Sequence, residues 1–263
     1  MSGPMSKSEY VARKVAAELN KAGITCVLWN QAAMGVYGFI DKPLPFEIKT
    51  VDFIVSDEKF DLAKSVLATA LEECRNKGIP IHLDLGHSEA HFLCKPEAQN
   101  PQPTEAKMLV GLVRQRTVLW GMPPLDSSLL TAATVPFSNL NFVSAEHPMF
   151  PMCPPGTETS ASVNPNVPEG YGRYGPIGCQ AFVMRPKLYA QTLMLCAARH
   201  YKGKRHVPIE ADVLKAMGDC LDRYKVADEL QEPFASLYRE LRKSDVARTE
   251  WVQRAHQALF ELF

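Results

Sequence analysis

The chain has 263 residues, of which 46% are apolar and 22% charged, and its 29 basic residues balance its 29 acidic residues. That length is enough for one large or two small domains with a sizeable core. Zero net charge argues against a general nucleic-acid binder, which normally carries a basic excess. No run approaches the roughly 18 apolar residues of a membrane span, and the N-terminus lacks an apolar signal core. We therefore expect a cytoplasmic protein with no membrane partner.

The N-terminal part alternates amphipathic helices with short apolar strands. Ser6 and Glu9 have the spacing of a capping box, and Gly23 closes the helix that they open. The next elements are a strand at 24–29, a short Ala-rich helix at 30–38, a buried strand at 50–55 and a helix that Ser56 or Asp57 begins. Extended segments are expected at 79–85, 90–94 and 107–120, the last as one strand or a hairpin.

The character of the chain changes after Gly121. Ten of the 20 prolines lie between 121 and 176, which is typical of a long functional loop or a connector. Beyond it, Pro186 is expected to be the first residue of a helix that has Gly203 near its end, and three more helical segments follow. We therefore predict an α/β domain at 1–120, a proline-rich loop or connector at 121–177 and a helical subdomain at 178–263.

The seven cysteines form no CxxC pair, and most of them lie in apolar runs. This pattern predicts reduced and mostly buried thiols. The signatures GxSxG, P-loop, GxGxxG and HExxH are also missing, so no common enzyme class is supported by a motif of its own.

Two stretches, "WNQAAMGVYG" and "KTVDFIVSDEKFDLAKSVLATAL", together resemble the opening of the nucleotidyltransferase-like superfamily, which has the polymerase-β-type fold. Its divergent fungal members have a strand, a Gly-Gly or Gly-Ser turn, a small helix ending in Tyr-Gly, and a strand with the pattern T-x-D-x-D. The later segments "VMRPKLYAQTLMLCAARH" and "ELQEPFASLYRELR" resemble their helical tail. The resemblance implies an α/β (α+β) fold: a mixed sheet flanked by helices, then a helical C-terminal subdomain.

The resemblance also implies that the catalytic centre is degraded. Phosphoryl transfer in this fold uses two Mg²⁺ ions, held by carboxylates two residues apart on one face of a strand. The aligned positions here are Thr50, Asp52 and Ile54, so one of the two carboxylates is missing. Asn30 and Gln31 replace the glycines whose backbone would approach a phosphate. Asp84 is the candidate third carboxylate, and Asp52 with Asp84 are the predicted ligands of a single Mg²⁺.

The candidate site follows from this alignment. We predict Asp52, Asp84 and His82 as catalytic residues. The predicted small-molecule contacts are Asn30, Gln31, Lys49, Thr50, Tyr171 and Tyr174. The alternative for Asp52 is a purely structural carboxylate, satisfied by the backbone, by Lys49 or by a helix N-terminus.

The most polar stretch, "HLDLGHSEAH", is open to three interpretations. Its histidines His82, His87 and His91, with Asp84, form a metal site, or they are scattered on a surface turn, or one histidine acts as an acid or base. Two functions of different class also remain open. One is a divergent transferase or small-molecule (secondary-metabolite) tailoring enzyme that uses the old cleft, and the other is a non-catalytic binding module that keeps only the fold.

Overall fold

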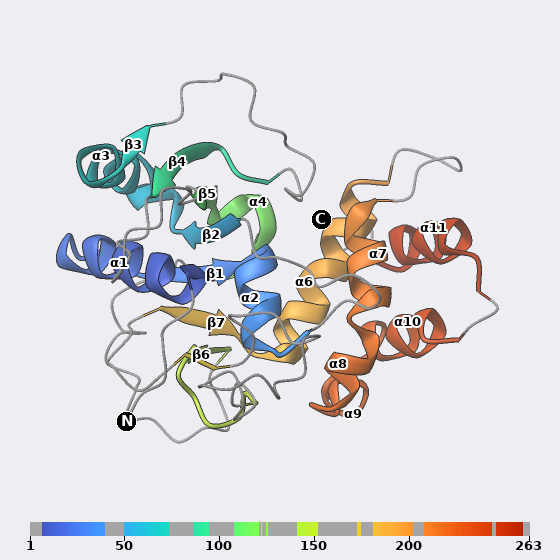
Figure 1. The fold of residues 1–263 in the computed structure, drawn as a ribbon. Helices are drawn as coiled ribbons and strands as arrows, with labels where there is room; N and C mark the ends of the chain where they lie inside the picture. The colour runs from blue at the N-terminus through green and yellow to red at the C-terminus, as the bar shows by residue number, and fades with distance from the viewer. Residues whose placement is uncertain are drawn as a thin grey trace. The chain divides into compact units, whose positions relative to one another are not determined.

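The computed structural model describes residues 7–39, 50–73, 87–94, 108–120, 122, 125, 141–151, 173–174, 181–201, 208–243 and 246–259. These residues belong to two compact units, Met1–Val183 and Met184–Phe263 (Figure 1). The sequence predicted three parts divided near 120 and 177, whereas the structure assigns everything up to Val183 to one unit.

The first unit is built on a mixed sheet. In the described part of the chain the sheet has seven strands, in the order β3-β4-β5-β2-β1-β7-β6. The strands are β1 (Cys26–Trp29), β2 (Thr50–Val55), β3 (Glu72–Glu73), β4 (Ala90–Cys94), β5 (Met108–Arg114), β6 (Phe142–Ser144) and β7 (Phe182–Met184). The central strand β2 runs antiparallel to β1 and parallel to β5, and β4 runs antiparallel to β5. Every residue of β2 is buried, as its apolar run predicted.

Helices flank this sheet, which confirms the predicted fold class. They are α1 (Lys7–Lys21), α2 (Asn30–Val36), the 3₁₀ turn η1 (Asp57–Lys59), α3 (Phe60–Ala70) and α4 (Gln115–Val118). Helices α1 and α3 pack against each other, and α2 packs against β1 and β2. Gly23 adopts a φ of 68° just after α1, where glycine avoids the strain of a left-handed backbone. Gly23 therefore ends α1, as predicted.

One predicted extended segment is wrong in its second half. Strand β5 ends at Arg114, and the helical turn α4 begins at Gln115, where the sequence favoured a longer strand or a hairpin. The Gln115 side chain donates to the Met122 carbonyl at 3.2 Å and accepts from the Leu125 N–H at 2.8 Å. These two hydrogen bonds, to backbone groups 7 and 10 residues further along the chain, stabilise the helical turn α4. The local pattern of apolar residues gives no sign of them.

The second unit is helical, as predicted. Its helices are α6 (Pro186–Arg199), α7 (Ile209–Ala216), α8 (Gly218–Asp222), α9 (Val226–Glu229), α10 (Phe234–Leu241) and α11 (Arg248–Leu259). Pro186 occupies the first turn of α6, which packs against α7 and α11. The indole N–H of Trp251, a fully buried residue, donates to the Leu237 carbonyl at 2.7 Å and so joins α11 to α10.

Two properties of the chain can be read from the described residues. Cys26, Cys94, Cys196 and Cys220 are buried free thiols, in agreement with the sequence. Across the same part of the chain, no helix combines the length and the apolar character needed to span a bilayer.

Candidate functional site

Asp52 lies at the centre of the sheet. Asp52 is buried, with only 2% of its surface exposed. It pairs with Trp29 of β1 on one side and with Gly111 of β5 on the other, and Gly111 pairs in turn with His91 of β4. Directly paired residues share one face of a sheet. Trp29, Asp52 and His91 therefore stand in a row across four adjacent strands, and Gly111 leaves a gap in that row.

The carboxylate of Asp52 occupies that gap. A Cβ atom built on Gly111 would lie 2.1 Å from Asp52 Oδ1 and 2.5 Å from the Ser88 hydroxyl, distances far below any real contact of a Cβ. Glycine is therefore the residue that lets the carboxylate and the serine meet above β5.

Three neutral side chains hold the Asp52 carboxylate. Asn30 Nδ2 donates to Oδ2 at 3.1 Å, and the Thr50 hydroxyl donates to the same oxygen at 3.2 Å. The Ser88 hydroxyl donates to Oδ1, also at 3.2 Å. A buried carboxylate without such donors would be strongly destabilising. We call Asn30, Thr50, Asp52 and Ser88 the Asp52 cluster.

The turn into α2 has a left-handed backbone conformation at Asn30 and carries two polar side chains, those of Asn30 and Gln31. Asn30 has a φ of 55°, a left-handed conformation that asparagine tolerates better than most residues. Its amide reaches Asp52, and the Gln31 side chain accepts a hydrogen bond from the Thr50 N–H at 3.3 Å. The two residues that replace the glycines of the resembled family are therefore bonded to β2.

The predicted site residues divide into three groups. Asn30, Thr50 and Asp52 meet in the Asp52 cluster, and Gln31 bonds beside it. Tyr174 lies elsewhere: its N–H donates to the Ala145 carbonyl just beyond β6, a strand that β7 and β1 separate from β2. The positions outside the described residues are Lys49, His82, Asp84 and Tyr171.

Two members of the site were not predicted from the sequence, namely Ser88 and Gly111. Ser88 lies in the polar stretch "HLDLGHSEAH", whose histidines were the candidate functional residues. One of these histidines, His87, packs beside Trp29 with 6.2 Å between ring centroids. Gly111 interrupts an apolar strand, and an isolated glycine in a strand often marks a close approach to the backbone. That signal was present in "MLVGLVR".

The described donor set does not fit a two-metal centre. Mg²⁺ takes oxygen ligands in an octahedron, and two ions need more than one carboxylate between them. Asp52 contributes the cluster's one carboxylate, and both of its oxygens already accept protein hydrogen bonds. Thr50 and Ile54, two residues away on β2, bring no charge. What the cluster can do is exchange a proton between a carboxylate and a hydroxyl.

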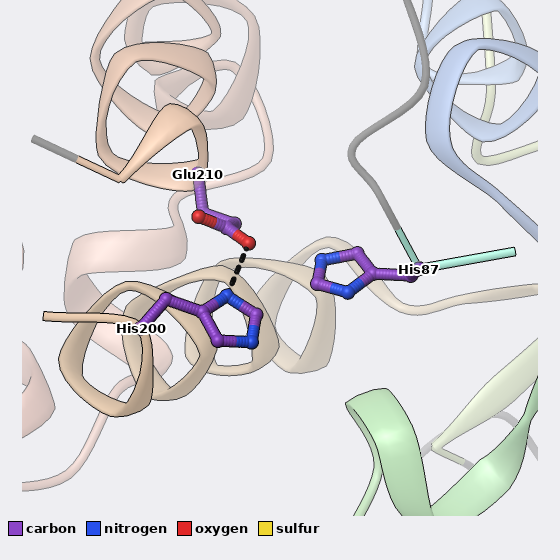
Figure 2. Close-up of side chains that lie close together, drawn as sticks. All are labelled: His87, His200 and Glu210. Carbon is purple, nitrogen blue, oxygen red and sulfur yellow. Dashed lines mark hydrogen bonds and ion pairs between the residues drawn. The ribbon is translucent and has the colours of Figure 1, made fainter. Parts of the chain in front are cut away.

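The second unit contains a different buried carboxylate. Glu210, only 1% exposed, lies in the first turn of α7, and its Oε1 is 2.8 Å from His200 Nδ1 at the end of α6 (Figure 2). Such a contact orients an imidazole ring. Burial raises the pKa of the Cys196 thiol well above its usual value, and the charge of Glu210 adds to the effect. Cys196 is therefore an inert thiol.

A cavity of about 370 Å³ also lies in the second unit, lined by Asp222, Lys225, Ala227, Asp228, Tyr238, Arg239 and Arg242. Asp222 accepts hydrogen bonds from the Tyr238 hydroxyl at 2.8 Å and from Arg242 Nε at 3.0 Å. Burial raises the pKa of Tyr238, and the bond to Asp222 raises it further. The ion pair of Asp222 with Arg242 and its hydrogen bond with Tyr238 join α8 to α10.

The Asp52 cluster is thus the part of the predicted site that the structure assembles. It joins the turn into α2, the strand β2 and the segment before β4 through a single carboxylate. Comparison of the chain with models of known protein families and with curated proteins gives no match.

Proposed function

We propose that this chain is a divergent nucleotidyltransferase-like protein with a degraded two-metal centre. In this proposal it is a transferase or small-molecule tailoring enzyme that works through Asp52 without paired metal ions. The order of strand, Asn-Gln turn, short helix and Asp-bearing strand supports the family assignment, as does the helical region that follows.

The observation that carries the proposal is the hydrogen bonding of Asp52. A carboxylate that ligates Mg²⁺ presents free lone pairs to the ion. The Asp52 oxygens instead accept from an amide and two hydroxyls. Oδ2 already accepts two hydrogen bonds, so a metal ion at that oxygen would have to displace a donor, whereas proton transfer to or from a bonded hydroxyl needs no rearrangement. The preserved chemistry is therefore that of an acid or base.

A second function has one observation in its favour. Asn30, Thr50 and Ser88 donate to Asp52, as donors would to a buried carboxylate whose role is structural. On this alternative the chain is a non-catalytic binding module that keeps the fold, and Asp52 joins its strands.

Thermal unfolding with nucleotides tests the proposal. The full chain is melted with ATP, GTP, CTP or UTP, each in Mg²⁺, Mn²⁺ or EDTA, because a ligand that binds the folded state raises the melting temperature. We expect the shift given by a bound nucleotide to be the same in EDTA as in metal, and to be lost in Asp52→Asn. Asp61→Asn is the matched control, since it removes a carboxylate that is 87% exposed on α3.

The outcomes separate the alternatives. Stabilisation that requires Mg²⁺ or Mn²⁺ and disappears in Asp52→Asn would mean a working metal centre, and would refute the proposal. If no nucleotide shifts the melting temperature under any condition, the nucleotide-site part of the proposal is refuted and the non-catalytic alternative is favoured.

A further inference from the structure

We propose that the cavity in the second unit binds a small amino-carboxylate of net negative charge, such as an acidic amino acid. This inference goes beyond the proposed function, because it involves neither Asp52 nor any other residue of the first unit. The cavity lies where α9 packs against α8 and α10 (Figure 1). We call it the α9–α10 cavity. Its volume of about 370 Å³ is near the lower end of the roughly 300–1,000 Å³ of small-molecule sites, so it suits a small ligand.

One part of the lining consists of charges that already have protein partners. Arg242 Nε donates to Asp222 Oδ2 at 3.0 Å, and the Tyr238 hydroxyl donates to Oδ1 of the same carboxylate at 2.8 Å. Both oxygens of Asp222 therefore accept a protein donor, and the bonds hold the end of α8 against α10. A ligand in the cavity meets the charges of the remaining lining residues instead.

Lys225 and Asp228 line the same cavity without pairing with each other. Both residues are exposed, and within the described ranges neither side chain takes part in a hydrogen bond or an ion pair. Each of these opposite charges is thus available to a partner from outside the chain. A ligand that carries both an anionic and a cationic group can satisfy the two at once, by charge-assisted hydrogen bonds.

The backbone of Lys225 indicates that its side chain has a role beyond folding. Its φ of 54° is left-handed, which is strained for any residue that has a Cβ atom. The turn imposes this conformation, because the Lys225 N–H donates to the Asp222 carbonyl at 2.9 Å and its own carbonyl accepts from the Asp228 N–H at 3.0 Å. Glycine would remove the strain at this position. Strained residues of this kind gather at functional sites, and we infer that the lysine is kept for its charge.

Arg239 adds a second cation to the cavity. Its Nη1 lies 3.7 Å from Glu232 Oε1, but both side chains of this ion pair are more than half exposed (57% and 63%), so the pair is weak. Its Nη2 donates to the Ala227 carbonyl at 3.4 Å, which links the guanidinium to α9. The remaining N–H groups of the guanidinium suit a carboxylate, because Arg presents five donors in a fork.

The sum of these charges selects the class of ligand. Lys225 and Arg239 supply two positive charges, and Asp228 supplies one negative charge. The complement is a molecule with two carboxylates and one ammonium group, in which the carboxylates meet the two cations and the ammonium meets Asp228. A dicarboxylate without the ammonium, or a phosphate, would leave Asp228 facing an anion, and like charges repel.

NMR titration of the ¹⁵N-labelled full chain tests the inference. The probes are L-glutamate, glutarate and inorganic phosphate; glutarate has the two carboxylates of glutamate but no ammonium group. Backbone amides at 222–242 report binding in the cavity, and the saturation of their shifts gives the dissociation constant. Lys243→Ala is the matched control, because Lys243 is an exposed lysine next to Arg242 that does not line the cavity.

We expect L-glutamate to bind about fivefold more tightly than glutarate or phosphate. Lys225→Gly should weaken the binding of glutamate and of glutarate alike, by about threefold to tenfold, because both use the lysine through a carboxylate. The midpoint of its urea unfolding should be unchanged or higher, since glycine relieves the left-handed strain. Asp228→Asn should abolish the preference for glutamate over glutarate. Lys243→Ala should bind each probe as the natural chain does.

The inference is overturned if no probe gives a saturating shift, or if glutarate or phosphate binds as tightly as L-glutamate. It is also overturned if Lys225→Gly binds glutamate unchanged, or if the preference for glutamate persists in Asp228→Asn. Both substitutions change exposed side chains that make no contact needed for folding, so the variants provide the test in folded protein. None of these outcomes involves Asp52, and the melting experiment therefore tests the proposed function separately.

Discussion

Replacing Gly111 with alanine tests the packing of the Asp52 cluster most directly. The new Cβ would lie 2.1 Å from Asp52 Oδ1, so the carboxylate has to move by at least 1.3 Å (3.4 − 2.1 Å) to reach an ordinary van der Waals separation. Its bonds of 3.1 and 3.2 Å to Asn30, Thr50 and Ser88 would then lengthen to about 4 Å, beyond the reach of a hydrogen bond.

The expected loss of stability follows from two effects. Overpacking a buried site destabilises by about 1–3 kcal/mol, and each lost bond to a charged group by about 1.5–3 kcal/mol, although partial relaxation recovers some of it. We expect Gly111→Ala to lower the free energy of unfolding by about 3 kcal/mol. In an Asp52→Ala background the same substitution should lower it by clearly less, because the clashing carboxylate is gone and only the Ser88 hydroxyl, 2.5 Å from the new Cβ, still has to move.

Urea unfolding followed by circular dichroism measures all four proteins of this cycle. Gly23→Ala is the control: nothing lies within 4 Å of its new Cβ, and its φ of 68° gives a strain of about 1–2 kcal/mol that does not depend on Asp52. If Gly111→Ala destabilises equally in the presence and absence of Asp52, the carboxylate does not occupy the space above Gly111 and the reasoning fails.

Three further predictions concern other parts of the molecule. Gly218→Ala places a Cβ 1.9 Å from Arg242 Nη1 and 2.7 Å from its Nε, so the guanidinium has to leave its ion pairs with Asp219 and Asp222; because these pairs are partly exposed and weak, urea unfolding should show a loss of about 1 kcal/mol. Glu210→Ala should lower the free energy of unfolding by about 1–3 kcal/mol, because a buried acceptor for His200 is removed; Glu210→Gln, which keeps an acceptor oxygen, should lower it less, and equal losses would contradict the role of that bond. Burial and, to a smaller extent, a neighbouring arginine lower the pKa of His147 from 6.5, so the unfolded chain binds the proton more readily than the folded one. The contribution of His147 is therefore complete above about pH 6.5 and is lost as the pH falls toward the lowered pKa; unfolding free energies measured between pH 5 and 8 (roughly the histidine range) should show a smaller acid loss in His147→Gln.

Much of the fold was predictable because its signals are local. The capping pattern and Gly23 delimited α1, and the apolar residues on both sides of Asp52 between Thr50 and Val55 predicted a buried strand, as β2 is. Pro186 likewise predicted where α6 begins. In each case a few adjacent residues determine the backbone conformation.

The site was predictable only in part. Asn30, Thr50 and Asp52 lie in the two segments on which the prediction of a nucleotidyltransferase-like family rests, and that prediction alone singled them out. Ser88 carries no such signal, since a serine beside two histidines is equally consistent with a surface turn. Its role depends on the register of β4 against β5, which no local pattern encodes.

The sequence, through hydrophobic periodicity, caps and one motif, was enough to establish a mixed α/β unit followed by helices, with a solitary carboxylate in a buried strand. Only the tertiary structure could identify the partners of that carboxylate. Asn30, Ser88 and Gly111 are respectively 22, 36 and 59 positions away from Asp52, and strand pairing brings them together. The physical reason is that a buried charge is stabilised by whichever donors the sheet register brings within about 3 Å of it, and that register is a property of the whole sheet.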